Sequence, residues 1–366
     1  MKTITKFIVI SLFFTFLFSL NGYSQYSSKR VKSKYEAYTD SIKNVDYNYI
    51  FPFWGAKAYK RGIDLQYPMG FMANFFWTTQ NITIDNFRLG FQNAHGGSFD
   101  FPLTQVSDSI LAFGNNENTS YSINIRPDIW LFPFIDIYGI FGFGRSSTSV
   151  EVLLFPDTPN QQSFTSNVDQ SLTTYGFGIL AAGGVGPVWL SVDANMTWNK
   201  PALLDKPTIV NVVGIRMGKA FVFKKRPQSN ISIWIGTMYV TMQSETVGAI
   251  ALKDGLPQDV WDKKDAFVEN YNNWYNNEAT PIQKKFADTY LTPVVDAIDQ
   301  RNGESIVQYG MDKQVKQHWN GLVGMQYQIN KNWQLRAEGG VLGNRKSFLF
   351  SLNYRFLVFR KPVPRA

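Results

Sequence analysis

The feature that most constrains this sequence is a two-residue alternation of apolar and polar side chains. From Tyr121 to Leu131 the odd positions carry apolar, tyrosine or proline side chains, while Ser122, Asn124, Arg126 and Asp128 occupy even ones. The alternation recurs over 135–144, 188–197, 323–329, 333–341 and 347–356. Successive side chains of a β-strand point to opposite faces, so each segment has one apolar and one polar face. These segments therefore predict β-strands.

The polar face of these strands is unusual in composition. It carries Gly, Ser, Thr, Asn, Asp and Arg, which fit a crowded interior where charges of both signs can pair. In a soluble β-sandwich, the alternative, that face would meet water and could carry many lysines. Aromatic residues make up 16% of the chain, and no segment after residue 24 has the roughly 18 apolar residues of a spanning helix. We therefore predict an all-β fold: a transmembrane antiparallel up-and-down β-barrel in the cell outer membrane of a Gram-negative bacterium.

The N-terminus has the pattern of a signal peptide. Lys2 and Lys6 precede an apolar run, Phe7–Leu20, and small residues at positions 22 and 24 precede Gln25. We predict cleavage after residue 24, since an uncleaved anchor would need a longer run. Cleavage removes two lysines and no acids, so the formal charge falls from +8 to +6. A small positive excess on an exported chain disfavours nucleic acid as a partner.

The chain contains no cysteine. It therefore has no disulfide framework, no thiolate metal site and no cysteine for a lipoprotein anchor. Two histidines without a spaced carboxylate motif give no signal for a metal. We expect no metal site and no cofactor.

The connections predict the number of strands, because outer-membrane barrels keep short turns in the periplasm and long loops outside. Short connections fall at 132–134, 184–186, 224–229 and 330–332, and long ones at about 95–118, 145–171 and 244–318. Eleven strands follow, and an even count requires one more, which we place in the weak stretch Tyr47–Asp64. We predict twelve strands, or ten if the weak early segments tuck inside or lie on the rim. The eleven are 69–78, 83–93, 119–131, 135–144, 173–183, 187–198, 209–223, 230–242, 320–329, 333–341 and 346–359.

Three further segments complete the predicted organisation. Residues 25–46 are polar and form a periplasmic tail before the barrel at 47–359, and residues 360–366 form a C-terminal tail. Within 254–318 the apolar period becomes helical, and Thr280 with Pro281 can start a helix that Gly303 ends. This helical insertion lies at the extracellular mouth and either partly plugs the pore or only shields the rim.

The predicted barrel interior contains a balanced set of charges. They either form a salt-bridge ladder that rigidifies a narrow barrel or line a polar path for a small solute. The predicted lumen-facing charged residues are Arg126, Asp128, Asp136, Asp193, Arg216, Arg336, Glu338 and Arg355.

A hydrolase site is a weaker possibility. His95 and Ser98, followed by Asp100, lie in a predicted outer loop, and a serine nucleophile needs a base and a carboxylate. Residues this close in sequence rarely form such a triad, so we predict no catalytic residues and no enzyme.

Two stretches near the C-terminus, with Tyr23-Ser24-Gln25, resemble outer-membrane β-barrel proteins of the Bacteroidota type. The hairpin from Trp319 to Phe348 looks like such a barrel's closing strands. The resemblance implies that Tyr354 and Phe356 form a terminal aromatic signal read by the barrel-assembly machinery. Barrels of this kind usually stop there, whereas this chain continues, so Phe359 could be the true end of the last strand.

Two main functions fit these predictions. The first is a narrow or gated pore that passes small polar solutes, with the helical insertion controlling access. The second is a surface-display or adhesion scaffold with no transport, in which a closed barrel anchors long loops. A lipid-acting barrel enzyme is a third. Outer-membrane lipid is an expected partner of each.

Overall fold

A computed structural model gives the fold of the chain. It describes residues 34–92, 101–159, 161–185, 187–202, 206–242, 245–340 and 342–359. The predicted signal peptide and the C-terminal tail at 360–366 lie outside these residues. None of the helices within the described ranges is long and apolar enough to cross a bilayer.

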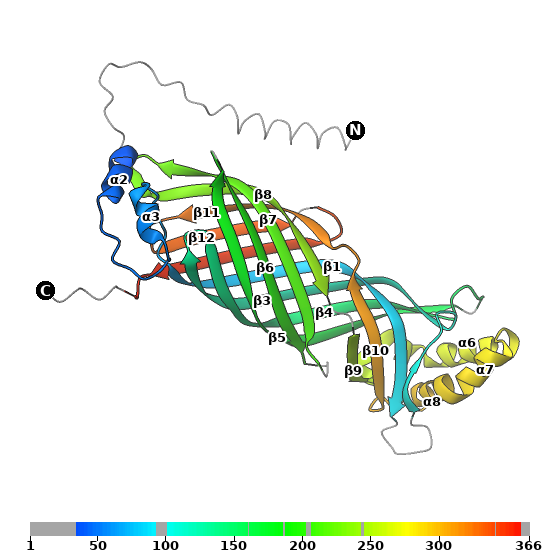
Figure 1. Ribbon diagram of the computed structural model, residues 1–366. Helices are drawn as coiled ribbons and strands as arrows, with labels where there is room; N and C mark the ends of the chain where they lie inside the picture. The colour runs from blue at the N-terminus through cyan, green and yellow to red at the C-terminus, as the bar shows by residue number, and fades with distance from the viewer. Residues whose placement is uncertain are drawn as a thin grey trace, which may run out of the picture.

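The centre of the molecule is a closed antiparallel barrel of ten strands (Figure 1). Neighbours along the chain pair in sequence, and the barrel closes where β1 pairs with β13 from Met69↔Phe356 to Thr79↔Lys346. The predicted fold class is therefore confirmed. The barrel strands are β1 (Met69–Gln92), β3 (Leu111–Phe132), β4 (Ile135–Leu154), β5 (Gln162–Val185), β6 (Val188–Pro201), β7 (Thr208–Phe223), β8 (Arg226–Met242), β11 (Trp319–Gln328), β12 (Trp333–Gly340) and β13 (Lys346–Phe356).

The two faces of the barrel wall differ as the alternation predicts. Large apolar side chains point outward, among them Phe143 at 68% and Ile125 at 53% exposure. Their polar neighbours along each strand point inward, and Asn74 and Ser351 are almost completely buried. An apolar exterior around a buried polar interior is the arrangement that a hydrocarbon surround requires.

The barrel has ten strands, the lower of the two numbers that the sequence allowed. The prediction of a strand in Tyr47–Asp64 is wrong, because this stretch lies at the rim and contains the short helix α3 (Gly55–Lys60). The two strands predicted at 69–78 and 83–93 are one strand, β1. The break predicted between them has no counterpart in the ladder, since the backbone of β1 stays hydrogen-bonded to β3 through Asn81.

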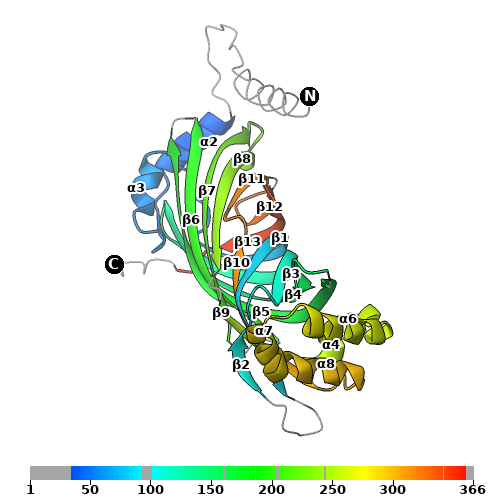
Figure 2. The same ribbon diagram turned by 90° about the vertical axis from the view of Figure 1, so that its right-hand side faces the viewer.

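Much of the sequence predicted as long loops continues the strands beyond the barrel. β4 and β5 stay paired from Ile135↔Ala181 to Leu154↔Gln162, although 145–171 was predicted as a loop. Beyond Thr79, β1 leaves β13 and pairs instead with β10 (Ile306–Val315), which in turn pairs with β9 (Glu245–Ala251). A short strand, β2 (Phe101–Gln105), also pairs with β1. We call these outer parts of β1, β3, β4 and β5, with β2, β9 and β10, the extension (Figure 2).

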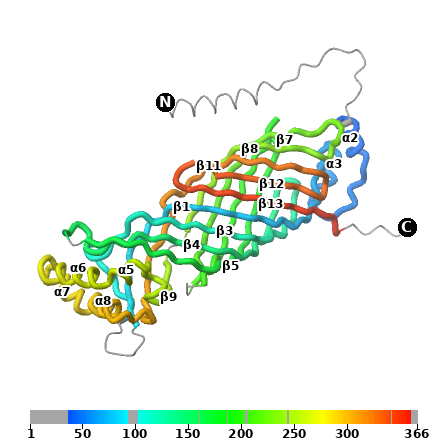
Figure 3. The backbone as a smooth tube through the Cα atoms, turned by 180° about the vertical axis from the view of Figure 1, so that it is seen from behind, coloured from blue at the N-terminus to red at the C-terminus, as the bar shows by residue number. Residues whose placement is uncertain are grey.

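Helices cover the extension. They are α4 (Leu252–Gly255), α5 (Gln258–Asp262), α6 (Lys264–Asn277), α7 (Pro281–Phe286), the π-helix η1 (Ala287–Leu291) and α8 (Thr292–Asp299). Thr280 caps α7 with a reciprocal bond to Gln283, and Pro281 takes the first position, as predicted. The helix predicted to end at Gly303 ends at Asp299, and the strand β10 begins at Ile306. The insertion is therefore helical only to Asp299. Figure 3 shows these helices at the end of the molecule away from α2 and α3.

The opposite end is covered by N-terminal residues. Part of the predicted periplasmic tail is the helix α2 (Lys34–Lys43). Asp64 accepts a hydrogen bond from Tyr38 and pairs with Lys331 of the β11–β12 turn at 2.6 Å. Trp54 packs on Phe132 beside the β3–β4 turn, with ring centroids 5.0 Å apart. This rim lies at the end of the short turns, which we predict to be periplasmic.

The C-terminal aromatic residues also lie at this end. β13 ends at Phe356, so the suggestion that Phe359 ends the strand is wrong. The carbonyl of Phe359 instead accepts a hydrogen bond from the amide of Ile50. Tyr354 and Phe356 both lie on the barrel wall, with ring centroids 6.1 Å apart. Their recognition by the assembly machinery stays a prediction.

Replacing Ile125 by arginine tests whether the wall faces hydrocarbon. The side chain points outward at mid-strand, so the charge would enter lipid, and we expect a loss of about 2–4 kcal/mol in the free energy of unfolding. Urea unfolding in lipid vesicles measures this loss, with Ile125→Leu as the control. If the arginine variant is as stable as the leucine variant, the wall does not face hydrocarbon.

Candidate functional site

The barrel lumen is the candidate functional site, because the inward faces of all ten strands bring polar side chains together there. A barrel of this size is largely filled by its own side chains. Asn74 of β1 donates to Asn124 of β3 at 2.8 Å, one of several contacts that cross between neighbouring strands. The charged groups occupy two separate levels of this interior.

The larger group centres on Arg216 of β7. Its Nε and Nη2 donate to the two carboxylate oxygens of Glu338 on β12 at 2.7 and 2.8 Å, and its Nη1 donates to Asp193 of β6. All three side chains are buried. A bidentate pair of this kind is the strongest geometry available to a guanidinium and a carboxylate. In the barrel β8 and β11 lie between β7 and β12, so the contact bridges two non-adjacent strands through the lumen.

Two further residues complete this group. Arg336 donates to Glu338 at 2.8 Å, and its guanidinium lies 4.9 Å from the ring centroid of Trp234. The indole Nε1 of Trp234 also donates to Glu338 at 2.8 Å. Glu338 therefore accepts from three side chains. We call Asp193, Arg216, Trp234, Arg336 and Glu338 the lumen plug.

The remaining predicted charges lie elsewhere in the lumen. Arg355 pairs with Asp128 at 2.7 Å and donates to the carbonyl of Tyr67, near the short turns. Arg126 stacks over the ring of Tyr138, with 3.8 Å between its guanidinium and the ring centroid. Asp136 is buried and makes no ion pair with any residue that the structure describes.

A cavity of about 350 Å³ occupies the lumen from the plug outward. On β1 its wall runs from Asn74 to Ile82, and the other strands line it with Asn, Ser, Thr and Gln, with charged residues and with apolar residues. The plug residues Asp193, Arg216, Arg336 and Glu338 line it, whereas Asp128, Asp136 and Arg355 do not. The lumen cavity thus reaches the plug but not the Asp128–Arg355 pair.

Two cations in the lumen cavity were missed by the sequence reading. Arg345 precedes β13 and is 5% exposed, and its Nε and Nη1 have no hydrogen-bond partner within the described residues. Lys313 of β10 also lines the cavity and pairs with no described acid. Neither residue lies in a segment with a clear alternation, which is why the pattern did not reveal them.

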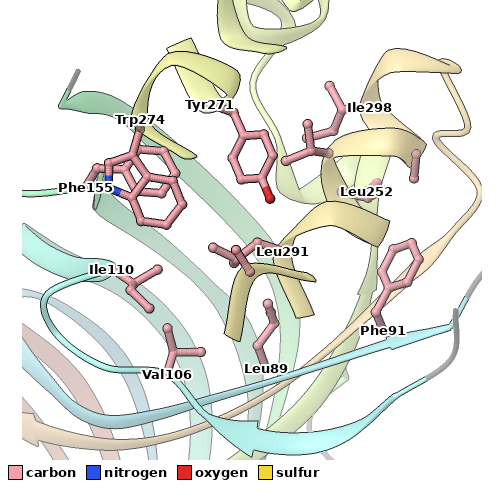
Figure 4. Close-up of a cluster of buried hydrophobic side chains, with 13 residues drawn as sticks. Leu89, Phe91, Val106, Ile110, Phe155, Leu252, Tyr271, Trp274, Leu291 and Ile298 are labelled. Carbon is pink, nitrogen blue, oxygen red and sulfur yellow. The ribbon is translucent and has the colours of Figure 1, made fainter. Parts of the chain in front are cut away.

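A second cavity, of about 220 Å³, lies in the extension between the strands and the helices. It borders a hydrophobic core built around Trp274, which stacks on Phe155 with ring centroids 4.0 Å apart (Figure 4). Leu291 and Ile298 of the helices pack into the same core as Leu89 of β1. The helices therefore rest on an apolar surface of their own, and none of their side chains lines the lumen cavity.

Solved structures with similar folds are transport or translocation barrels at low similarity. The β domain of the Bordetella autotransporter Brka is 8% identical, with a TM-score of 0.35, and the match covers 79% of this chain and 100% of that one. The translocator domain of autotransporter NalP from Neisseria meningitidis is 12% identical, with a TM-score of 0.31, and the match covers 82% of this chain and 92% of that one. The Ralstonia pickettii toluene transporter TbuX is 6% identical, with a TM-score of 0.28, and the match covers 79% of this chain and 90% of that one.

Comparison by sequence gives no relative: no family model matches the chain, and no curated protein does.

The structure describes only some of the residues considered for a hydrolase site or a metal site. His95, Ser98 and Asp100 lie outside the described residues. His318 bonds through Nδ1 to the carbonyl oxygen of Val240 at 2.8 Å, which gives its ring a structural role. Within the described ranges, no three His, Cys, Asp or Glu side chains are grouped to hold a metal ion.

Proposed function

We propose that the chain is an outer-membrane barrel that acts as a gated pore for small polar solutes, with the lumen plug as its gate. The observation that carries this proposal is the polar lumen cavity, which ends on the plug. A solute in that cavity meets many side chains that can donate and accept hydrogen bonds, beside an apolar patch from β7, β8 and β11. The plug, the Asp128–Arg355 pair and the N-terminal residues at the rim lie between it and the short-turn end.

The plug has the properties of a gate held closed by charge pairing. Its contacts join β6, β7, β8 and β12 within the lumen, and each depends on side-chain position rather than on the backbone ladder. Side chains can change rotamer while the barrel stays closed, so passage does not require the wall to open. The gate that this proposal names differs from the helical insertion predicted from the sequence, because the helices do not line the lumen.

A scaffold without transport is the second candidate, and one observation favours it. The extension and its helices have a hydrophobic core separate from the lumen, as a surface module anchored by a barrel would have. Under that proposal the paired charges only fill and rigidify the barrel.

Several finer statements are part of the proposal. The apolar wall supports outer-membrane lipid as a partner, and export by a cleaved signal peptide rests on the first 24 residues. Recognition by the barrel-assembly machinery rests on Tyr354 and Phe356, and the Bacteroidota type on the resemblance alone. The predicted absence of enzymatic activity can be tested with the substitutions His95→Ala and Ser98→Ala, because a hydrolase that uses these residues would lose its activity.

Removing the plug should convert a mostly closed barrel into a conducting one. The quadruple variant Asp193→Ala, Arg216→Ala, Arg336→Ala and Glu338→Ala deletes two charges of each sign, so the net charge of the lumen is unchanged. In planar bilayers we expect rare steps for the wild type and frequent, long openings for the variant, because the cavity then extends past the plug.

The control for this experiment is the double variant Lys253→Ala and Glu304→Ala, which removes an exposed ion pair on the extension. It should conduct as the wild type does. A quadruple variant that inserts as a folded, heat-modifiable barrel and stays as silent as the wild type would contradict the pore and favour the scaffold.

A further inference from the structure

The lumen cavity and the apolar cavity of the extension share part of their lining. Thr148, Gln170 and Lys313 border both. One side of this junction is the polar lumen, and the other is a space enclosed by hydrocarbon side chains. The junction is therefore a boundary between two environments, and it lies beyond the wall that faces lipid, where β1 has left β13 for β10.

The apolar cavity has the lining of a binding site for a hydrocarbon chain. Aliphatic and aromatic side chains come from two sources, the strands of the extension and the helices that cover it. Cavities of this kind are unusual inside proteins, because well-packed cores leave little space. An apolar cavity with a few polar groups at one end is the common form of a small-molecule site. Representative lining residues are Phe87, Val150, Val168, Leu291, Val295 and Met311.

Lys313 is the single charged side chain in the described lining of the apolar cavity. No described acidic group lies close enough to alter its pKa, which burial lowers to about 8. The ammonium group is thus mostly protonated at pH 7 but has lost much of its hydration. Lys313 is partly buried and has no described acid beside it, and an anion there would offset the lost hydration of the charge.

Thr148 can assist such an anion. Its Oγ1 accepts a hydrogen bond from the side-chain amide of Asn118 at 2.9 Å, which leaves the hydroxyl proton able to donate to a ligand. The junction thus offers one cation and one hydroxyl donor, next to a cavity whose lining is mostly apolar.

We propose that this junction binds an amphipathic organic anion, with its carboxylate at Lys313 and Thr148 and its alkyl chain in the apolar cavity. This site goes beyond the proposed pore function, since it requires no passage through the plug. A purely polar anion would leave the apolar cavity unused, and a neutral hydrocarbon would leave Lys313 unpaired. The amphipathic anion satisfies both parts of the site.

Binding of decanoate to the full chain in lipid nanodiscs tests this proposal. Isothermal titration against protein-free nanodiscs should show one saturable site for decanoate and at least tenfold weaker binding for 1-decanol and for acetate. Lys313→Met should weaken decanoate binding by about tenfold or more, since a charge-assisted hydrogen bond is lost. Lys313→Arg should largely retain it.

Two further variants serve as matched comparisons. Lys316→Met removes an exposed lysine just after β10 and should leave decanoate affinity unchanged. Val168→Trp fills the apolar cavity from β5 and should abolish decanoate binding while Lys313 stays in place. All variants are first checked for a heat-modifiable gel shift, which reports a folded barrel.

The pH dependence gives an independent readout. Decanoate affinity should fall above about pH 8 as Lys313 loses its proton, towards the affinity of Lys313→Met, and Lys313→Arg should abolish this fall. The other titratable groups of the apolar cavity are Tyr271, whose pKa burial raises to about 12, and Tyr309. Those of the lumen cavity are Arg126, Asp193, Arg216, Arg336, Glu338 and Arg345.

Equal affinity of the wild type and Lys313→Met for decanoate would overturn the proposal, as would equal affinity for decanoate and 1-decanol. Neither result bears on conductance. Conversely, a silent plug-deleted variant would remove the pore and leave this binding site standing, so the two proposals can fail separately.

Discussion

Glu338→Ala should lower the free energy of unfolding of the barrel by about 3–5 kcal/mol. Glu338 accepts hydrogen bonds from Arg216, Arg336 and Trp234, and its removal leaves the Arg336 guanidinium buried without an acid partner. Breaking one partner from a buried ionic group is costly, because the remaining charge cannot regain its water. Urea unfolding in lipid vesicles, followed by tryptophan fluorescence, measures the loss.

A matched control for this variant is Glu304→Ala. Glu304 pairs with Lys253 at 2.6 Å, but both side chains are more than half exposed. Exposed ion pairs contribute little, so the unfolding midpoint should not change. Equal midpoints for the two alanine variants would show that the plug does not hold the barrel together.

Trp274→Ala should destabilise the extension by about 3–5 kcal/mol and leave the barrel unchanged. Trp274 is 1% exposed, stacks on Phe155 and lies at the centre of the core that joins helices to strands. Hydrogen exchange resolved by peptide should show faster exchange in α6 and α8, while peptides from β11, β12 and β13 keep their protection. Sub-global opening of this kind is expected where one core is separate from another.

The control for Trp274→Ala is Ile282→Ala on α7, whose side chain is 83% exposed. It removes apolar atoms from the same insertion without making a cavity, so exchange should match the wild type. If Trp274→Ala instead destabilised the barrel peptides as much as the helices, the extension and the barrel would be one cooperative unit.

The two proposals together describe a barrel with two cavities that accept different kinds of ligand. The lumen cavity ends on a paired charge cluster, whereas the apolar cavity meets the lumen at an unpaired lysine. A ligand bound at Lys313 would lie beside the lumen cavity, so occupancy there could alter access to it. Conductance of the plug-deleted variant with and without decanoate would reveal such coupling.

Sequence-based prediction worked best where one face of a strand meets lipid. Ile123 and Ile125 point outward and Asn124 inward because a strand in hydrocarbon leaves no other choice, and the alternation reports that directly. It failed beyond the lipid. Over Ser146–Thr148 and Thr165–Ser171, polar residues lie on both faces, so the pattern vanishes although the backbone ladder continues.

The sequence by itself determined the class of fold, the inward direction of most lumen side chains and the helical character of most of the insertion. These depend on local periodicity, which each segment carries alone. Only the tertiary structure decided the count of ten strands, the pairing of Arg216 with Glu338 and the position of Lys313 between two cavities. Those features depend on strand register and barrel closure, which bring together residues more than a hundred positions apart. A local pattern in the sequence does not specify which distant residues will meet.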